Sequence, residues 1–193
     1  MKSDIILAGV GGQGILSIAA VLGAAALQEN LNLKQAETHG MSQRGGAVVS
    51  HLRISGKPIA SDLIPLGSAD LILSVEPMES LRYLPYLSED GCLVTNTTPF
   101  INIPDYPDIE DILNEIHQLP HFIAVEADHI AKEAGHVRTS NMVMLGAASL
   151  FIGMEFSALE EGVRCLFHRK GEAVVEMNLK ALRAGRQSAG NHK

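Results

Sequence analysis

Short apolar runs and longer apolar or amphipathic stretches alternate along the chain. The short runs are rich in β-branched residues or alternate between apolar and polar positions, which is typical of strands. They occupy residues 5–8, 33–37, 47–54, 69–75, 91–96 and 122–126. The longer stretches predict helices over 15–27, 77–87, 109–118, 128–135, 141–153 and 171–184. Strands that alternate with helices predict an α/β fold, in which a mostly parallel sheet is flanked by layers of helices.

Proline and capping residues set the ends of several of these helices. Pro77 suits the first turn of a helix, and Pro85 is expected to disrupt the end of the same helix. Asp128 is expected to cap a short helix that stops at Gly135, and Thr139-Ser140-Asn141 offers capping side chains to the next one. Asn141 is therefore interpreted as a cap rather than as a ligand group.

The length of 193 residues fits one domain. We assign residues 1–184 to this domain, because the last amphipathic helix is followed by Gly185 and by polar residues. Residues 185–193 are expected to form a flexible tail. Gly146 lies in a run of small residues and is expected to let its helix pack tightly against the sheet.

The first strand leads directly into a glycine-rich turn that opens the first helix. Gly9, Gly11 and Gly14 match the spacing G-x-G-x-x-G, in the strand–turn–helix setting that a phosphate-binding turn requires. Glycine permits a turn with positive φ, lets backbone N–H groups approach an anion, and allows close packing of helix on strand. The candidate cofactor-binding residues of this turn are Gly9, Gly11, Gly12, Gln13 and Gly14.

Two other interpretations of the turn stay open. A dinucleotide site normally has an acidic residue about 20 positions further on, and only Glu37 lies near that place. Glu37 is followed by Thr38-His39-Gly40 instead of a recognisable ribose-binding pattern, so NAD is disfavoured relative to another phosphate or anion. A glycine turn at the first strand–helix junction also occurs for packing alone.

A second loop, residues 38–46, carries three glycines, hydroxyl groups, an amide and one arginine. Arg44 can present a guanidinium fork beside backbone N–H groups, which suits a phosphate or a carboxylate. The candidate cofactor-binding residues of this loop are Ser42, Gln43, Arg44, Gly45 and Gly46. A surface arginine at a flexible loop, or one in a subunit contact, would show the same pattern.

The remaining polar residues give weaker signals. Glu76 follows a buried strand, at the side of the sheet where α/β domains bind ligands, but Pro77 makes a helix-start role at least as suitable. The eight histidines show no metal-binding spacing, because Pro120 separates His117 from His121 and indicates that their helix has ended. The sequence has no nucleophile elbow, no Walker lysine and no thiol pair, so catalysis by this chain alone is not expected.

Charge and cysteine content exclude several classes of protein. The formal charge of −7 argues against a general binder of nucleic acid or anionic membranes. The apolar runs at 15–27 and 142–152 are shorter than the roughly 18 residues that span a bilayer. Cys92 and Cys165 are expected to be buried thiols in a reducing cytoplasm, and two cysteines are fewer than an iron–sulfur cluster normally needs. No secretory signal is recognised before the first strand, so a cytoplasmic location is expected.

Taken together, the two loops resemble a known family. The residues that carry the resemblance are Gly9-Val10-Gly11-Gly12-Gln13-Gly14-Ile15-Leu16 and Glu37-Thr38-His39-Gly40-Met41-Ser42-Gln43-Arg44-Gly45-Gly46, with support from Ala69-Asp70-Leu71, Glu76-Pro77, Asn141-Met142 and Leu145-Gly146. They resemble the gamma-type subunit of the 2-oxoacid:ferredoxin oxidoreductases, and within that family the small (beta) subunit of the indolepyruvate enzymes. The resemblance extends to about residue 182.

This resemblance implies a Rossmann-like domain of the pyruvate/ketoisovalerate oxidoreductase gamma type, working as a subunit of a larger enzyme. Such an enzyme oxidatively decarboxylates a 2-oxoacid to an acyl-CoA and passes electrons to ferredoxin. The resemblance implies that a larger partner subunit carries thiamine diphosphate and the iron–sulfur clusters. This chain is then expected to complete the assembly and to border the CoA and active-site cleft through its glycine turn and Arg44 loop.

Two alternatives to this function stay open. The glycine turn alone would suit a self-sufficient NAD(P)- or flavin-binding oxidoreductase, against which the missing ribose acid counts. A scaffold protein, whose glycine turn is purely structural, would suit the same residues. Aryl and branched 2-oxoacids other than indolepyruvate also remain open as substrates.

Overall fold

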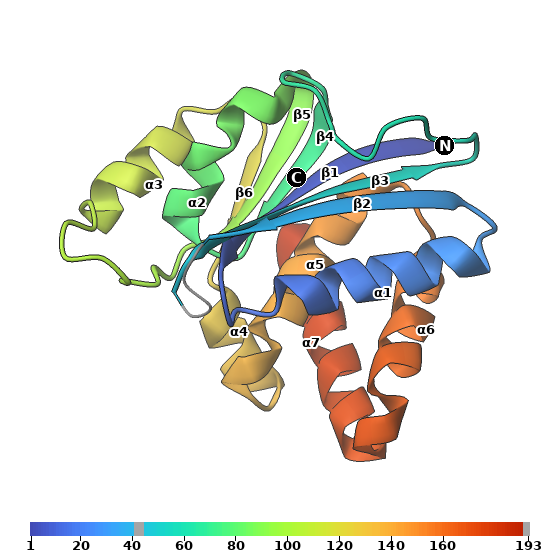
Figure 1. The fold of residues 1–193 in the computed structure, drawn as a ribbon. Helices are drawn as coiled ribbons and strands as arrows, with labels where there is room; N and C mark the ends of the chain where they lie inside the picture. Colours follow the sequence, from blue (N-terminus) through green and yellow to red (C-terminus); the bar gives the residue numbers. More distant parts are fainter. Residues whose placement is uncertain (41–44, 191–193) are drawn as a thin grey trace.

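The computed structural model describes residues 1–40 and 45–190, which build a six-stranded sheet with helices on both faces (Figure 1). The strand order is β2-β3-β1-β4-β5-β6. The bounds of the strands are β1 Lys2–Val10, β2 Asn32–His39, β3 Ala47–Ser55, β4 Ala69–Ser74, β5 Leu87–Asn96 and β6 Phe122–Val125. Strands β1, β4, β5 and β6 are parallel, whereas β3 pairs antiparallel with both β1 and β2. The predicted α/β fold with a mostly parallel sheet is confirmed.

The helices form two layers of unequal size. Helices α1, α5, α6 and α7 lie on one face of the sheet, and α2 and α3 lie on the other (Figure 1). The bounds of the helices are α1 Ile15–Gln28, α2 Pro77–Arg82, α3 Ile109–His117, α4 Ala127–Ala134, α5 Ser140–Ile152, α6 Phe156–Phe167 and α7 Glu172–Gly190. Because α1 and α2 follow neighbouring strands but cover opposite faces, the carboxyl ends of β1 and β4 form the switch point where α/β sheets bind ligands.

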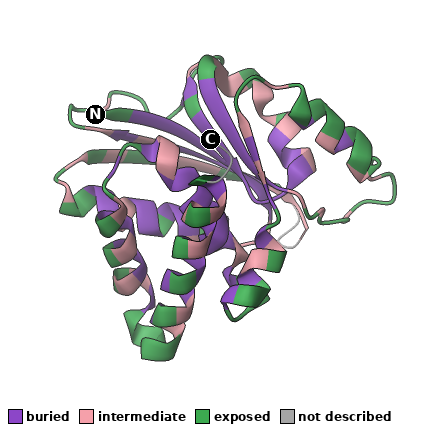
Figure 2. Cartoon of the chain, turned by 180° about the vertical axis from the view of Figure 1, so that it is seen from behind, coloured by how far each residue is buried: buried purple, intermediate pink, exposed green. Residues whose placement is uncertain are grey.

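Strand β1 is buried on both faces, which explains its unbroken apolar run. Ile5 and Leu7 belong to the core beneath α1, α5, α6 and α7, whereas Ile6 and Ala8 belong to the core beneath α2 and α3. Figure 2 shows this buried centre, with exposed residues on the outer faces of the helices. A central strand covered on both sides is typical of a parallel α/β sheet.

Several predicted helix bounds need correction. Helix α6 was not predicted. Gly162 in its middle packs closely on α1, and a Cβ there would lie 2.6 Å from the carbonyl oxygen of Val21. Helix α7 continues to Gly190 instead of ending at 184, and both Gly185 and Ala189 are buried. The predicted boundary of a tail at residue 185 is therefore wrong. Helix α2 ends at Arg82, and Pro85 lies in a 3-10 turn that follows.

Helices α5 and α7 cross at two glycines. A Cβ at Gly146 would lie 1.9 Å from the carbonyl oxygen of Leu182, and a Cβ at Gly185 would lie 1.9 Å from that of Val143. Gly146 thus allows close packing, as predicted, but against α7 rather than against the sheet. The contact fixes the position of α7 beside α5, and both helices form walls of the candidate site described below.

The two cysteines differ from each other. Cys92 is buried on β5, as predicted, and burial raises the pKa of its thiol to about 11. Cys165 on α6 is exposed, so the prediction of a buried thiol is wrong there. Among the described residues, no helix is long and apolar enough to cross a membrane.

We predict that Gly185→Ala destabilises the chain by about 1–3 kcal/mol, because its methyl group has no room against α5. Urea unfolding followed by circular dichroism measures the change. Gly190→Ala, near the end of the same helix and with no atom within 4 Å of the new methyl group, is the control and should lose no stability. Equal stability of the two variants would contradict the close crossing.

Candidate functional site

The glycine turn between β1 and α1 has the conformation that its sequence predicts. Gly12 and Gly14 have φ values of 103° and 84°, in the left-handed region that favours glycine. Gly14 occupies the N-cap position of α1. A Cβ at Gly14 would lie 2.5 Å from Nδ2 of Asn141, so another residue here would adopt a strained backbone and displace the Asn141 amide.

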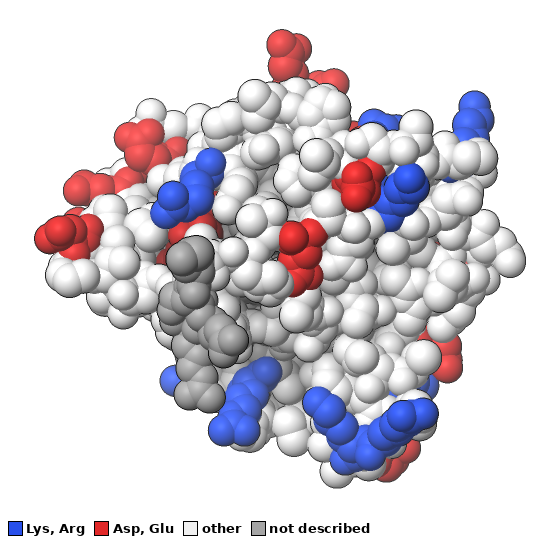
Figure 3. Space-filling view, viewed as in Figure 1, with Lys and Arg blue, Asp and Glu red and all other residues white. Residues whose placement is uncertain are grey.

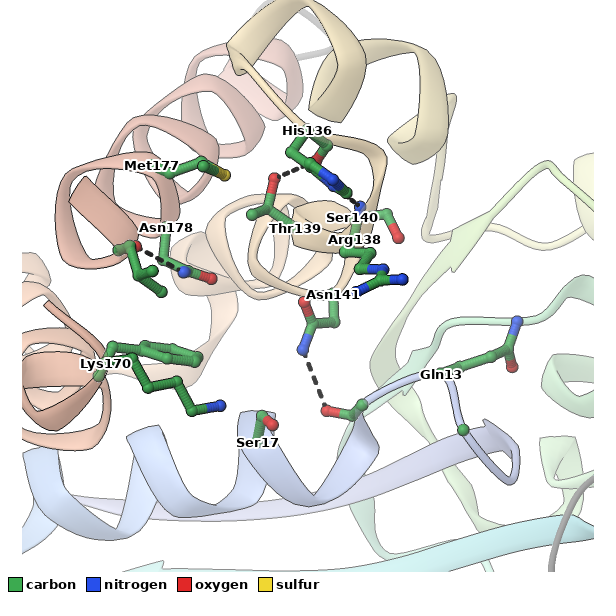
Figure 4. Close-up of a pocket in the computed structure, with 14 residues that line it drawn as sticks. Gln13, Ser17, His136, Arg138, Thr139, Ser140, Asn141, Lys170, Met177 and Asn178 are labelled. Carbon is green, nitrogen blue, oxygen red and sulfur yellow. Dashed lines mark hydrogen bonds between the residues drawn. The ribbon is translucent and has the colours of Figure 1, made fainter.

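Gln13 closes the turn through its side-chain amide. Its Oε1 accepts a hydrogen bond from the N–H of Val10 at 2.8 Å, and its Nε2 donates to the carbonyl oxygen of Val75 at 3.3 Å. The amide therefore links the carboxyl ends of β1 and β4. Figure 4 shows the Gln13 side chain pointing away from the neighbouring cavity, so the contact it offers to a ligand there comes from its backbone.

Two asparagines extend this pattern of bridging amides. Asn96, at the end of β5, donates to the carbonyl oxygen of Val75 at 3.4 Å and accepts from the N–H of Ala127 at 3.2 Å. Asn141 donates to the carbonyl oxygen of Gly14 at 3.2 Å and thereby joins α5 to the start of α1. The role of Asn96 was not predicted from the sequence. The signal that could have indicated it is an amide side chain at the end of a predicted strand.

The capping predictions in this region are partly wrong. Helix α5 begins at Ser140, so Asn141 lies within its first turn, and the N-cap residue Thr139 makes no side-chain capping bond. Helix α4 stops at Gly135 as predicted, but its N-cap is Glu126, and the carboxylate of Asp128 accepts from Nδ2 of Asn96 at 3.5 Å. Asp128 therefore bonds to a distant strand end, whereas Asn141 does both: its Oδ1 accepts from the N–H of Met142 at 3.0 Å and its Nδ2 donates to the carbonyl oxygen of Gly14.

The structure brings the described end of the second predicted loop against the glycine turn. The N–H of Gly11 donates to the carbonyl oxygen of Gly46 at 2.9 Å. Asn102, on the loop between β5 and α3, donates through Nδ2 to the carbonyl oxygen of Gly45. The candidate residues Ser42, Gln43 and Arg44 lie outside the described residues.

Glu76 starts helix α2, and its helix-start role is confirmed. Its fully buried carboxylate accepts from the N–H of Glu79 at 2.8 Å and from the N–H of Phe100 at 3.3 Å, and the hydroxyl of Tyr106 also donates to it. Burial, together with the bond to Glu76, raises the pKa of Tyr106. Glu76 thus holds the loop that carries Asn102 against the carboxyl edge of the sheet.

A cavity of about 560 Å³ lies beside the turn, between α1, α5 and α7 (Figure 4). Three predicted residues, Gly12, Gln13 and Gly14, line it. The other lining residues are Ser17, His136, Arg138, Thr139, Ser140, Asn141, Phe167, Lys170, Val174, Met177 and Asn178. A smaller hollow of about 300 Å³ on the other side of the turn includes Gly11 and His39. The predicted Gly9 lines neither, because it packs against Val75.

The electrostatics of the larger cavity are basic. Arg138 and Lys170 line it, and no aspartate or glutamate among the described residues does. Figure 3 shows lysine and arginine side chains gathered on the lower part of the molecule, the end at which α4, α6 and α7 lie in Figure 1. The sequence analysis missed both cations, because they come from short 3-10 turns far from the glycine motif in sequence.

The geometry does not place an acid where a dinucleotide ribose would need it. Glu37 lies on β2, the outermost strand, where it pairs with Ser50 of β3. The antiparallel strand β3 separates it from β1 and the glycine turn. In a dinucleotide-binding sheet the strand that follows the first helix lies directly beside the first strand. The insertion of β3 therefore counts further against NAD.

Comparison with known proteins settles the family. A model of the pyruvate ferredoxin/flavodoxin oxidoreductase family matches residues 4–188. The chain belongs to this family. It is 37% identical to the indolepyruvate oxidoreductase subunit IorB of Archaeoglobus fulgidus, over 98% of this chain and 96% of that protein. It is 38% identical to the corresponding subunit of Pyrococcus horikoshii, over 96% and 95% of the two chains.

Solved structures of pyruvate ferredoxin/flavodoxin oxidoreductase relatives share the fold. The gamma subunit of a keto/oxoacid ferredoxin oxidoreductase from Geobacter sulfurreducens superposes with a TM-score of 0.71 and 26% identity, over 98% of this chain and 99% of that one. The 2-oxoglutarate:ferredoxin oxidoreductase of Magnetococcus marinus gives a TM-score of 0.77 at 23% identity, and this chain spans 31% of that chain. The predicted family and its subunit character are confirmed.

We predict that Gln13→Met destabilises the chain by about 1–3 kcal/mol, because the N–H of Val10 and the carbonyl oxygen of Val75 lose a partner. Urea unfolding measures the loss. Gln28→Met, at the exposed end of α1, is the matched control and should change stability little. A Gln13→Met variant as stable as the control would show that the amide bridge is not structural.

Proposed function

We propose that this chain is the small subunit of a 2-oxoacid:ferredoxin oxidoreductase of the indolepyruvate type. The observation that carries the proposal is the match to the Archaeoglobus fulgidus subunit, which covers both chains almost from end to end. The assembled enzyme oxidatively decarboxylates an aryl 2-oxoacid, forms an acyl-CoA and passes electrons to ferredoxin. No catalytic residue is assigned to this chain.

The larger subunit supplies thiamine diphosphate and the iron–sulfur clusters in this proposal. The cysteine content supports this division, because two cysteines, one buried and one exposed, are fewer than a cluster normally requires. In residues 1–40 and 45–190, no three histidine, cysteine or acidic side chains gather as metal ligands. The chain contributes a folded surface that completes the site.

The carboxyl edge of the sheet is the part that we propose borders the CoA and active-site cleft. The glycine turn and Gly45-Gly46 are joined there, and Glu76 and Asn102 hold the loop between β5 and α3 beside them. On this loop the side chain of Ile101 is 72% exposed to solvent. Phe100 and Ile103 on the same loop are exposed by 41% and 42%, and such a group of exposed apolar side chains suits a surface that a partner subunit covers.

Sequence similarity favours an aryl substrate within the family. Four indolepyruvate oxidoreductase subunits, the two above among them, are 35–38% identical to this chain, whereas a 2-oxoglutarate synthase subunit of Methanothermobacter marburgensis is 29% identical. Ketoisovalerate oxidoreductase subunit VorA of the same organism is 28% identical, and this chain spans 35% of it. Indolepyruvate is therefore the first substrate to test.

We predict that the tagged chain, purified without oxygen from its own cells, brings with it a larger chain that contains iron and thiamine diphosphate. The complex should reduce a viologen dye when indolepyruvate and CoA are added, and it should be slower with 2-oxoglutarate. A chain that elutes alone with a bound nicotinamide or flavin would overturn the proposal in favour of a stand-alone dinucleotide oxidoreductase.

We predict that Arg44→Ala, in the same complex, raises the KM for CoA roughly tenfold and leaves the recovery of the larger subunit unchanged, because one charged contact to phosphate is lost. Lys57→Ala, in an exposed turn after β3, is the control and should change neither quantity. Loss of the larger subunit with an unchanged KM in the remaining complex would instead assign Arg44 to the interface.

A further inference from the structure

We propose that the cavity of about 560 Å³ between α1, α5 and α7 binds a phosphate ester of nucleotide size. Arg138, Lys170 and the glycine turn at the start of α1 hold its phosphate groups, and the apolar wall formed by α7 and Phe167 receives its organic part. The proposal rests on the geometry of this cavity and does not depend on the subunit role of the chain.

Two helices begin at this cavity. Helix α1, of 14 residues, and helix α5, of 13 residues, both have residues of their first turns in its lining. Neither helix has a side-chain capping bond, and neither has an acidic residue in its first turn. The backbone N–H groups of Gly12 and Gly14 have no acceptor among the residues that the structure describes. At the start of α5, the N–H of Ser140 donates to the carbonyl oxygen of Val137 and the N–H of Met142 donates to Oδ1 of Asn141, so the N–H groups left for an anion are those of the glycine turn. These groups and the dipole of α1 favour an anion.

Two cations complete the anionic preference. Arg138 precedes α5 and Lys170 precedes α7, so each lies at the start of a cavity wall. Neither forms an ion pair with a carboxylate in the described part of the chain. Four other arginines do form such pairs: Arg53, Arg82, Arg164 and Arg183. Nζ of Lys170 lies over the ring of Phe167 instead. In a chain with a net charge of −7, a cavity whose described lining holds two cations without carboxylate partners and no acid is well suited to a multiply charged ligand.

A buried amide provides an independent sign of a ligand. Asn178 on α7 is only 5% exposed, and its Nδ2 donates to the carbonyl oxygen of Val174 at 2.7 Å. Its Oδ1 has no donor among the described residues, and Figure 4 shows the amide directed into the cavity. Because this oxygen opens onto the cavity and is not sealed in the core, a ligand hydroxyl or amino group can reach it and donate to it.

The remaining wall and the volume indicate the size and chemistry of the ligand. Val174, Met177 and the ring of Phe167 give the cavity apolar lining, and Nζ of Lys170 lies over that ring, 5.3 Å from its centroid. Pockets of about 300–1,000 Å³ hold small organic ligands rather than single ions. A free nucleotide and the nucleotide end of CoA share the required chemistry, a diphosphate joined to a sugar and a base. Either molecule could therefore place the same diphosphate–sugar–base group in the cavity.

Isothermal titration of the full chain with ADP tests the proposal. Arg138→Gln and Lys170→Gln should each weaken ADP binding roughly tenfold, since each removes one charge-assisted contact. Asn178→Asp should weaken it further, because it adds a negative charge at nearly constant shape. Arg169→Gln, next to Lys170 but outside the cavity lining, is the matched control and should leave the affinity unchanged. Adenosine, which lacks phosphate, should bind far more weakly than ADP.

Competition between ADP and CoA then identifies the source of the ligand. Displacement of ADP by CoA, with the same sensitivity to Arg138→Gln and Lys170→Gln, would assign the cavity to the nucleotide end of CoA. Simultaneous binding would assign it to a free nucleotide. The proposal is overturned if ADP fails to bind the folded chain at millimolar concentration, or if the double variant binds it as well as Arg169→Gln does. Neither result bears on the subunit role, because the co-purification experiment tests that role separately.

Discussion

The architecture depends on how backbone groups are satisfied where the parallel strands end. At the carboxyl ends of the parallel strands, the last carbonyl and N–H groups have no partner in a neighbouring strand but remain partly buried. In this chain, side-chain amides take over this function. Gln13 and Asn96 both donate to the carbonyl oxygen of Val75, and Asn141 donates to that of Gly14. Three amides thus fix four segments relative to one another, while the N–H groups of Gly12 and Gly14 keep no acceptor in the described part of the chain.

The local part of the site was predictable, and the part that closes over it was not. The spacing of Gly9, Gly11 and Gly14 gave the turn, because glycine conformation depends on neighbours in sequence. Asn141 is 127 residues away from Gly14, and it was interpreted as a cap because nothing local reveals its partner. Arg138 and Lys170 belong to no motif, and only the packing of α5 and α7 brings them to the turn.

The fold shows the same division. Six strands and most helices followed from hydrophobic pattern, whereas the errors came from residues whose local preference is overridden by packing. Gly185 resembles a helix stop, but α7 continues through it. Glycine is needed there because a side chain would collide with the backbone of Val143. Gly162 weakens the helical pattern of α6 for a similar reason, since its bare backbone lies against Val21. In both places the glycine marks a close contact between two helices and not the end of a helix.

The position of β1 at the centre of the sheet also bears on how the chain folds. This strand is made first, yet its two neighbours are β3, which ends at Ser55, and β4, which ends at Ser74. Until those residues have left the ribosome, an apolar strand that is buried on both faces in the native state has no partner of its own. Contacts so distant in sequence slow folding and leave strand edges open to aggregation. Helix α1, which packs on the face of β1 that carries Ile5 and Leu7, ends at Gln28 and is thus complete well before either strand partner.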